Sequence, residues 1–228
     1  MVIAHRGASG HCPENTLKGI EEAISIGCDV VEIDLKVTRD GHIILMHDDY
    51  LDRTTNGRGE VKRATLDQIK NLDAGEGERV PLLTEVFERF ETSGAKFMLD
   101  VSNAGFEERL VKVVKSFDFE DRSIFSGSHG PLALIKSLDP KLKIAPSFDR
   151  ASREGVAKSL SMGADIYNCN YRTVSRHLVE LAHRSGLQVI VWVVNDTDEM
   201  GKMIDVGVDG ITTDYPDALL GVARRFVD

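Results

Sequence analysis

The sequence predicts an α/β fold of the (β/α)8 barrel class, also called the TIM barrel, on three observations. The chain has 228 residues, which is a typical length for one such barrel. Short apolar runs alternate with segments of helical periodicity, as βαβ units require. The apolar runs can be counted as eight strands, whereas the alternative, an open doubly wound sheet, more often has about five to seven.

The predicted strands are short and rich in apolar and β-branched side chains. They cover residues 2–4, 30–35, 97–101, 123–126, 142–145, 165–168, 188–194 and 210–213. Between the first two strands, Leu17, Ile20 and Ile24 follow the three- or four-residue spacing of one helix face, and residues 110–117 repeat this spacing later in the chain. Such segments predict helices that pack on the barrel wall.

One segment interrupts the alternation after the second predicted strand. Residues 43–47 indicate an extra strand, joined to the preceding one through the turn residues 39–41. Residues 48–80 are predicted to form a small insertion over the barrel mouth, because long loops in such folds usually carry function. Within this insertion, Thr65 is a candidate N-cap for a short helix. We expect residues 1–228 to form a single domain around one core.

The charge of the chain restricts its ligands. Lys and Arg total 28 against 37 Asp and Glu, which gives a net charge of −9. A negative surface repels nucleic acids and anionic lipid headgroups. We therefore expect a small-molecule phosphate substrate, no nucleic-acid partner and no stable membrane association, while the oligomeric state is left open.

The cysteines and the N-terminus bear on location. Cys12, Cys28 and Cys169 are odd in number and far apart, so neither a disulfide framework nor a structural zinc site is indicated. No apolar run approaches the roughly 20 residues of a membrane span. The first residues meet a polar, glycine-rich turn too soon for a signal peptide. The sequence therefore predicts a reducing compartment, which is the cytoplasm.

Acidic side chains on two predicted strands indicate a metal site. Glu32 and Asp34 alternate along one strand, so both side chains face the same way with Cα atoms about 6.5–7 Å apart. Asp100 closes another apolar run, and the C-terminal strand ends of a barrel point toward the active-site mouth. Three carboxylates favour a hard divalent cation, Mg²⁺ or Ca²⁺ with Mn²⁺ as a further candidate. The alternative is an edge strand whose polar face contacts water.

Two histidines and one arginine also follow predicted strands. His5 and Arg6 end the first strand and precede a glycine-containing turn, and His47 ends the extra strand. Two imidazoles at one mouth can supply the acid and the base that phosphoester cleavage requires near neutral pH, and a guanidinium can hold phosphate oxygens. Each histidine taken alone is more often a structural or surface residue than a catalytic one.

Two further residues have competing interpretations. Glu14 follows Pro13 near the start of the first predicted helix, where both residue types serve helix initiation, and a contact with substrate is the alternative. Trp192 is the only tryptophan and lies late in a predicted strand. It can either pack in the core or form the apolar wall of a substrate pocket.

The chain resembles the glycerophosphodiester phosphodiesterase family in several motifs, their order and their spacing. These motifs are His5-Arg6-Gly7, Pro13-Glu14-Asn15-Thr16, Glu32-Ile33-Asp34, Thr38-Arg39-Asp40-Gly41, His47-Asp48 and Arg53-Thr54-Thr55-Asn56-Gly57. Near the C-terminus, residues 191–195 and 207–216 resemble the last two strands of that family. The resemblance covers the first quarter and the last fifth of the chain well and is weaker between them.

The resemblance implies a barrel with an insertion at its mouth. It also implies hydrolysis of glycerophosphodiesters to glycerol phosphate and an alcohol, with a divalent metal ion. By the same resemblance, His5 and His47 are the acid/base pair and Arg6 binds the phosphate. Glu32 and Asp34 are implied as metal ligands.

The third strand departs from the family pattern. Family members typically have a Glu followed two residues later by a Lys, and this chain has Asp100 and Ser102. Asp100 can still bind a metal ion, but Ser102 supplies no charge to a phosphate. Residues 126–129 also lack an aromatic side chain that is common there. The resemblance further suggests that Glu14 faces the site.

Two other functions stay open on the sequence alone. One is a related barrel phospholipase that acts on lysolipids, although the chain has no basic or amphipathic stretch suited to a membrane surface. The other is a phosphoglycerol-binding protein without turnover, which Ser102 and the altered middle strands would fit.

Overall fold

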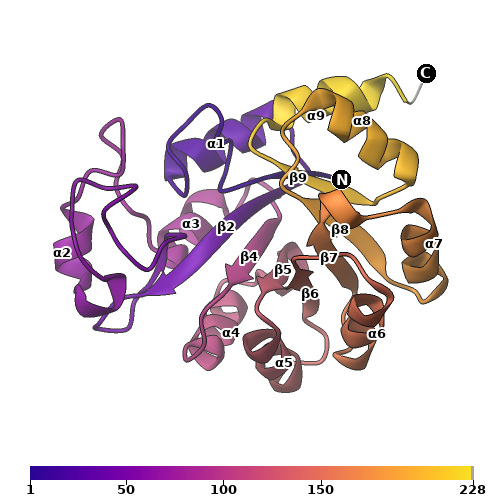
Figure 1. Ribbon diagram of the computed structural model, residues 1–228. Coiled ribbons are helices and arrows are strands. Elements are labelled where there is room, and N and C mark those ends of the chain that lie inside the picture. Colours follow the sequence, from indigo (N-terminus) through magenta and orange to yellow (C-terminus); the bar gives the residue numbers. More distant parts are fainter. Residues whose placement is uncertain (227–228) are drawn as a thin grey trace.

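The computed structural model describes residues 1–226, and they form a closed barrel of parallel strands. The strand order is β1-β9-β8-β7-β6-β5-β4-β2, and the pairing of β1 with β2 closes the ring. Helices surround the barrel and connect its strands (Figure 1). The fold class predicted from the sequence is therefore confirmed.

The elements follow the predicted order. The strands are β1 (Val2–Ala4), β2 (Val30–Val37), β3 (Ile43–Leu45), β4 (Phe97–Val101), β5 (Ser123–Gly127), β6 (Lys143–Phe148), β7 (Ile166–Asn170), β8 (Gln188–Trp192) and β9 (Gly210–Thr213). The α-helices are α1 (Leu17–Ile26), α2 (Leu66–Lys70), α3 (Leu83–Phe90), α4 (Glu107–Ser116), α5 (His129–Leu138), α6 (Arg153–Ser161), α7 (Arg176–Arg184), α8 (Thr197–Val206) and α9 (Pro216–Arg224). The 3-10 helices are η1 (Val61–Arg63), η2 (Glu120–Arg122) and η3 (Tyr171–Thr173).

Several strand boundaries differ from the predicted ones by a few residues. β6 and β7 both extend further than expected, β8 stops at Trp192, and β3 stops at Leu45. β3 is antiparallel to β2, and its register runs only from Val37 opposite Ile43 to Leu35 opposite Leu45. His47 therefore lies two residues beyond the extra strand, where the chain leaves the sheet.

α1 starts later than expected from Pro13 and Glu14, which were predicted to lie near its first turn. Thr16 is the N-cap, and its side chain accepts a hydrogen bond from the backbone N–H of Gly19. Pro13, Glu14 and Asn15 consequently precede the helix, and Asn15 has a left-handed φ of 56°, which asparagine adopts more readily than most residues. This turn directs side chains toward the barrel mouth.

Strand alternation divides the core into an outer and an inner layer. Val31, Ile33 and Leu35 of β2 are buried beneath the helices on the outer face. The intervening residues point into the barrel, where an apolar cluster fills the lower part. This inner cluster contains Ile3, Val30, Met98, Ala145, Ile166 and Ile190.

Above the inner cluster, the inward-facing positions become polar. Val30 is followed on the same face of β2 by Glu32 and Asp34, and Met98 is followed on β4 by Asp100. The apolar layer excludes water from the lower barrel, while the polar residues above it surround the mouth formed by the C-terminal strand ends. This arrangement positions the candidate site.

The segment between β3 and α3 has its own small apolar cluster. Ile44 and Met46 contribute from the barrel side, and Leu51, Val61 and Ile69 contribute from the segment. It contains η1 and α2 and lies to one side of the barrel (Figure 1). α2 begins after Thr65, which forms a capping box with Gln68, so the predicted N-cap is confirmed.

Two glycines provide a matched test of packing between β4 and β5. Gly127 has a φ of 112°, and a Cβ atom there would lie 2.8 Å from the backbone of Val101. We expect Gly127→Ala to lower the free energy of unfolding by roughly 2–4 kcal/mol, because it combines backbone strain with overpacking. Urea denaturation measures this change.

Gly130→Ala is the control. Gly130 lies in α5, and nothing lies within 4 Å of the position that a Cβ atom would take there. Alanine at this position should therefore leave the unfolding free energy unchanged or raise it by up to about 1 kcal/mol. Equal stability of the two variants would contradict the tight β4–β5 contact.

Among residues 1–226, the structure contains no helix that combines the length and the apolar character of a membrane span.

Candidate active site

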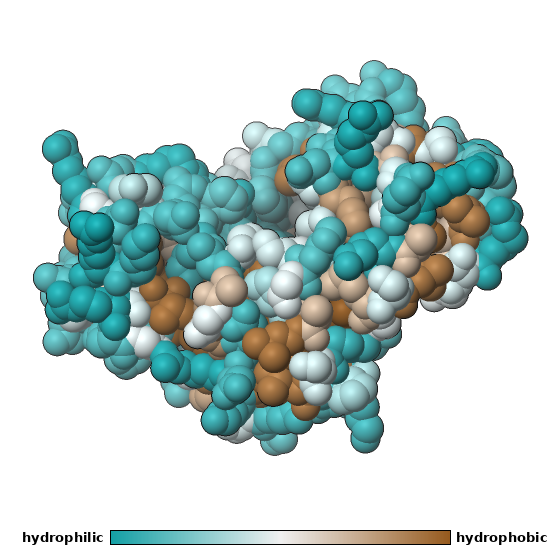
Figure 2. All heavy atoms as spheres, turned by 60° about the horizontal axis from the view of Figure 1, so that its bottom comes forward, coloured by the Kyte–Doolittle hydropathy of each residue, from teal (hydrophilic) through white to brown (hydrophobic). Residues whose placement is uncertain are grey.

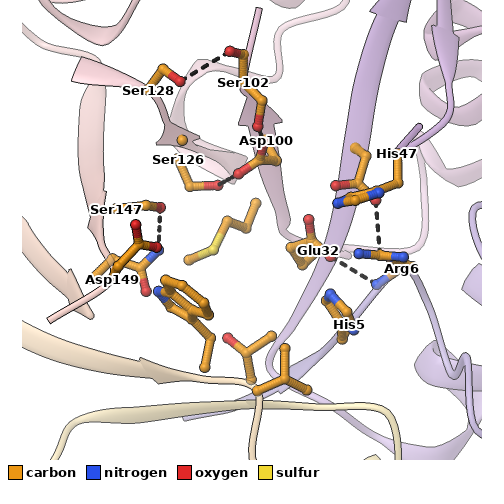
Figure 3. Close-up of a pocket in the computed structure, with 17 residues that line it drawn as sticks. His5, Arg6, Glu32, His47, Asp100, Ser102, Ser126, Ser128, Ser147 and Asp149 are labelled. Carbon is orange, nitrogen blue, oxygen red and sulfur yellow. Dashed lines mark hydrogen bonds and ion pairs between the residues drawn. The ribbon is translucent and has the colours of Figure 1, made fainter. Parts of the chain in front are cut away.

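A cavity of about 520 Å³ opens at the C-terminal ends of the barrel strands. His5, Arg6, Glu32 and His47 lie on one side of it, and Ser126, Ser128, Ser147 and Asp149 lie on the other (Figure 3). The predicted site residues His5, Arg6, Glu32, Asp34, His47, Asp100 and Trp192 all line this cavity. Glu14 does not line the cavity, although its carboxylate accepts a hydrogen bond from Arg6, which does.

His5 is held by an aspartate from the other end of the chain. Its Nδ1 lies 2.6 Å from Oδ1 of Asp214, and Asp214 also accepts hydrogen bonds from Ser9 and Asn195. Burial alone would raise the pKa of Asp214, but the hydrogen bonds from His5, Asn195 and Ser9 outweigh burial and lower it to about 2. Asp214 is therefore ionised at neutral pH, and it leaves Nε2 of His5 free for a ligand.

His47 has a similar partner nearby. Its Nδ1 lies 2.6 Å from Oδ1 of Asp48, and Asp48 is in turn bound by the guanidinium of Arg53 at 2.6 Å. The hydrogen bond from Arg53, with a smaller contribution from His47, lowers the pKa of Asp48 well below its ordinary value. Arg53 also donates to Glu14, so the loop that carries His47 is tied to the loop before α1.

Arg6 occupies a strained turn between β1 and the site. Its φ is 53°, and Gly7 follows with a φ of 79°; a Cβ atom on Gly7 would lie 2.6 Å from the backbone of Gly19. The backbone N–H of Arg6 donates to Glu32 at 2.8 Å. Strain of this kind persists where surrounding structure enforces it and concentrates at functional sites.

The Arg6 side chain is fixed by acids on both sides. Its Nη1 lies 2.9 Å from Glu14, and its Nε lies 3.1 Å from Oδ2 of Asp34. Asn15 donates to the same Asp34 oxygen at 2.8 Å and accepts from the Asp34 backbone N–H. The guanidinium is therefore already oriented before any ligand binds.

The three predicted metal ligands come from adjacent strands in register. Asp34 of β2 is paired with Asp100 of β4, and Glu32 precedes Asp34 by two residues on the same face. Burial, followed by the charges of Asp34 and Asp100, raises the pKa of Glu32 well above its ordinary value. Burial also raises the pKa of Asp100, against the hydrogen bond from Ser102.

The donor chemistry of this carboxylate group fits a divalent cation. Within residues 1–226, no three His, Cys, Asp or Glu side chains already stand in a metal-binding arrangement. Asp34 contacts Asn15 and Arg6, and Asp100 accepts hydrogen bonds from Ser102 and Ser126. The raised pKa values nevertheless indicate that the negative charges are incompletely offset, which is the electrostatic condition that a hard ion relieves.

Lys36 is a nearby cation that sequence reasoning did not identify. It continues the inward-facing positions of β2 beyond Asp34 and is 8% exposed. Its Nζ donates to Asp49 at 2.7 Å and to Asn103. Lys36 thus ties the segment after β3 to the loop after β4, close to the uncharged Ser102.

Other site residues were also missed, although a simple rule would have found some of them. On a strand, the residue two positions after an inward-facing apolar residue also faces inward. This rule identifies Ser126 after Ile124, Ser147 after Ala145 and Asn168 after Ile166. This rule needs the correct strand boundaries and faces, which local patterns defined only approximately for these strands. Asp214 and Asn195 lie in the C-terminal segments that resemble the family, but no local pattern indicated that Asp214 contacts His5 or that Asn195 contacts Asp214.

The sequence is similar to those of known proteins over nearly its whole length. Residues 5–218 match the Glycerophosphoryl diester phosphodiesterase family. A protein from Caldanaerobacter subterraneus subsp. tengcongensis named "Glycerophosphodiester phosphodiesterase" is 38% identical, with 99% of this chain and 98% of that protein covered. A human protein named lysophospholipase D is 25% identical, with 98% of this chain and 86% of that protein covered.

Solved structures agree with these sequence matches. A phosphodiesterase from Oleispira antarctica, described in complex with the product sn-glycerol-3-phosphate, superposes with a TM-score of 0.93. It is 28% identical, and the match covers 98% of this chain and 96% of that one. The family match over most of the chain, the relative at 38% identity and the shared barrel lead to one conclusion. The chain belongs to the glycerophosphoryl diester phosphodiesterase family.

Proposed function

We propose that this protein hydrolyses glycerophosphodiesters to glycerol phosphate and an alcohol by metal-dependent histidine acid/base catalysis. One observation carries the proposal: two histidines, each bound to an ionised aspartate, face a cavity that also contains Arg6 and three carboxylates. The product complex described for the Oleispira antarctica phosphodiesterase supports the glycerol phosphate half of the substrate.

The histidines are suited to proton transfer. In each, the aspartate at Nδ1 sets the ring orientation and leaves Nε2 as the exchanging atom. His5 and His47 lie on the same side of the cavity, one on each side of Arg6 (Figure 3). One histidine takes a proton from the attacking group, which is either water or the glycerol hydroxyl, and the other gives a proton to the leaving alkoxide. If the glycerol hydroxyl attacks, it forms a cyclic phosphate, which water then opens to glycerol phosphate.

Arg6 and the carboxylates are suited to the phosphate. Arg6 offers N–H donors to phosphate oxygens from an orientation that Glu14 and Asp34 already hold. Glu32, Asp34 and Asp100 would hold a divalent ion, with Mg²⁺, Ca²⁺ and Mn²⁺ as the candidates. When bound, such an ion would polarise the phosphate oxygens and offset the charge that develops on them.

We place the whole chain in one catalytic domain and assign residues 48–80 to an insertion at the barrel mouth, which lies beside the cavity and contributes none of its lining residues. Two ties support this assignment. Arg53 reaches from the insertion to Glu14, and Asp49 is bound by Lys36 of β2. Both hold the His47 loop against the cavity.

The direct test is hydrolysis of glycerophosphocholine, glycerophosphoethanolamine and glycerophosphoglycerol, followed by phosphorus NMR. The proposal expects the phosphodiester signal to be replaced by that of glycerol phosphate. Release of inorganic phosphate or of a phosphorylated headgroup alcohol, or no product at all from these diesters, would reject it.

A lysolipid-hydrolysing enzyme is a second candidate, because a human relative carries the name lysophospholipase D. On the face shown in Figure 2, however, apolar side chains form separate groups among hydrophilic ones rather than one broad surface for an acyl chain. Adding lysophosphatidylcholine to the same assay discriminates: preferred cleavage of the lysolipid would favour this candidate.

The third strand provides a separate test of the metal ligands. If Asp100 binds the ion, Asp100→Asn should raise the metal concentration needed for half-maximal activity by roughly 10–100-fold, since it removes one charged ligand. Activity should then recover in part at high metal concentration. Asp100→Glu, which keeps the carboxylate, is the control and should stay closer to the wild type. A loss in Asp100→Asn that no added metal relieves would assign Asp100 a structural role.

A further inference from the structure

The cavity has a second half whose chemistry differs from the catalytic side. The headgroup half, as we call it, is formed by the C-terminal ends of β5 to β8. It consists of Ser126, Ser128, Ser147, Asp149, Asn168 and Trp192. Figure 3 shows Ser126, Ser128, Ser147 and Asp149 facing His5 and Arg6 across the cavity. A phosphodiester held by Arg6 would therefore extend one of its alcohols into the headgroup half.

Asp149 gives the headgroup half a negative charge. It follows the last residue of β6 and is the only charged side chain among the described residues of this half. Its carboxylate has no ion pair and no hydrogen bond within residues 1–226, in contrast to Glu14, Asp48 and Asp214 in the same mouth. A carboxylate left without a protein partner at a cavity wall favours a cationic ligand.

Asn168 adds an unused acceptor deeper in the headgroup half. Its side chain is 4% exposed, and its amide nitrogen donates to Ser147 at 3.0 Å. Its carbonyl oxygen is buried and has no hydrogen-bond partner in the part of the chain that the structure describes. Burying a polar atom without a partner is unfavourable, so a ligand N–H at this position would remove that penalty.

Trp192 contributes a donor beside these acceptors. Its indole N–H is buried and, within residues 1–226, has no acceptor. An oxygen of the same ligand, such as the ester oxygen that joins the headgroup to phosphorus, could accept this hydrogen bond. The headgroup half thus combines acceptors for an ammonium group with a donor for the adjoining oxygen.

From these observations we infer that the headgroup half recognises a primary ammonium group, with Asp149 and Asn168 as specificity-determining residues. The inference rests on the proposed function and names the substrate within it: a glycerophosphodiester of an aminoalcohol, represented by glycerophosphoethanolamine. A primary ammonium carries three N–H donors, which match the Asp149 carboxylate, the Asn168 carbonyl and the serine hydroxyls. The scissile bond and the catalytic residues are unchanged.

Two other alcohols fit the headgroup half less well. A quaternary ammonium such as choline has the charge but no N–H, so the Asn168 carbonyl would stay unpaired. A neutral alcohol such as glycerol can donate hydrogen bonds but leaves Asp149 without a counter-charge. A site that offers hydrogen bonds discriminates strongly against a ligand that cannot make them.

The experiment compares kcat/KM for three diesters with the metal-loaded enzyme. The wild type should prefer glycerophosphoethanolamine to glycerophosphocholine and to glycerophosphoglycerol, each by at least about tenfold. Asp149→Asn should lower kcat/KM for glycerophosphoethanolamine by about tenfold, a modest factor because Asp149 is exposed. The value for glycerophosphoglycerol should stay within about twofold of the wild type, because that substrate makes no use of the charge.

Asp121→Asn is the matched control. Asp121 is an exposed acid in η2, which precedes the N-terminal end of β5, while the cavity lies at the C-terminal end. Its replacement therefore changes the net charge by the same amount without altering the cavity. Asp149→Lys places a positive charge at the same exposed position. It should therefore lower kcat/KM for glycerophosphoethanolamine further than Asp149→Asn does. An equal loss for all three diesters in Asp149→Asn, or no loss for any, would overturn the inference. Wild-type preference for glycerophosphocholine would do the same.

A binding measurement separates failure of this inference from failure of the proposed function. Calorimetric titration of glycerophosphoethanolamine and glycerophosphoglycerol into the wild type and Asp149→Asn needs no turnover. In one outcome, no diester is hydrolysed, the wild type binds glycerophosphoethanolamine more tightly than glycerophosphoglycerol, and Asp149→Asn binds the two equally. This outcome would support the ammonium site and contradict the proposed function. If the diesters are hydrolysed but the wild type binds both with equal affinity, the proposed function is supported and the ammonium site is contradicted.

Discussion

Replacing His5 or His47 by alanine is expected to lower kcat by about 10²–10⁴-fold, because each substitution removes one proton-transfer partner. The protein should stay folded. The His47 side chain is 48% exposed, and His5 belongs to none of the apolar clusters. Steady-state kinetics with the preferred diester, together with thermal denaturation of each variant, measures both parts of the prediction.

His177→Ala is the control for these two variants. His177 lies on the outer helix α7, where its ring contacts Arg153 on α6, so its loss should leave kcat unchanged. Near wild-type turnover in folded His5→Ala or His47→Ala protein would remove that histidine from the mechanism. A double variant no slower than the slower single variant would indicate that both histidines serve the same step.

Removing divalent metal is expected to lower activity by more than about a hundredfold, since the ion would offset several kcal/mol of developing charge. Glu32, Asp34 and Asp100 supply only oxygen ligands, so Mg²⁺, Ca²⁺ or Mn²⁺ should restore activity after chelation by EDTA and dialysis. Activity is measured before chelation, after it and after each metal is added back.

A second readout makes the metal prediction independent of catalysis. An ion that binds the folded protein raises its melting temperature in proportion to the logarithm of metal concentration well above Kd. The wild type should show this shift, and Asp100→Asn should show it only at higher concentrations. The metal hypothesis would be wrong if the protein kept full activity after exhaustive chelation and its melting temperature did not change when metal was added.

Local sequence patterns were sufficient to predict the barrel and one half of its site. Strand alternation places Glu32 and Asp34 on one face of β2 whatever the rest of the chain does, and His5 and His47 each follow an apolar run. These features depend on neighbours within a few residues, so the sequence displays them directly. The register of β2 against β4 then places Asp100 beside Asp34.

The boundaries of the middle strands were harder to predict because their ends are polar. β6 continues through Ser147, which adds no apolar periodicity to a run, and β7 continues to Asn170, two residues beyond its predicted end. Ser147 lines the cavity, so a polar residue that obscures the strand signal is also one that forms the headgroup half.

The sequence by itself determined which residue types are proposed to carry the chemistry, because periodicity and motif spacing are local properties of the chain. Only the tertiary structure decided which groups hold them in place. Asp214 reaches His5 across 209 positions of sequence, and Arg53 joins Glu14 to Asp48. The first of these contacts exists because closure of the barrel brings β1 and β9 side by side, and no local pattern encodes the pairing of distant side chains that the fold creates.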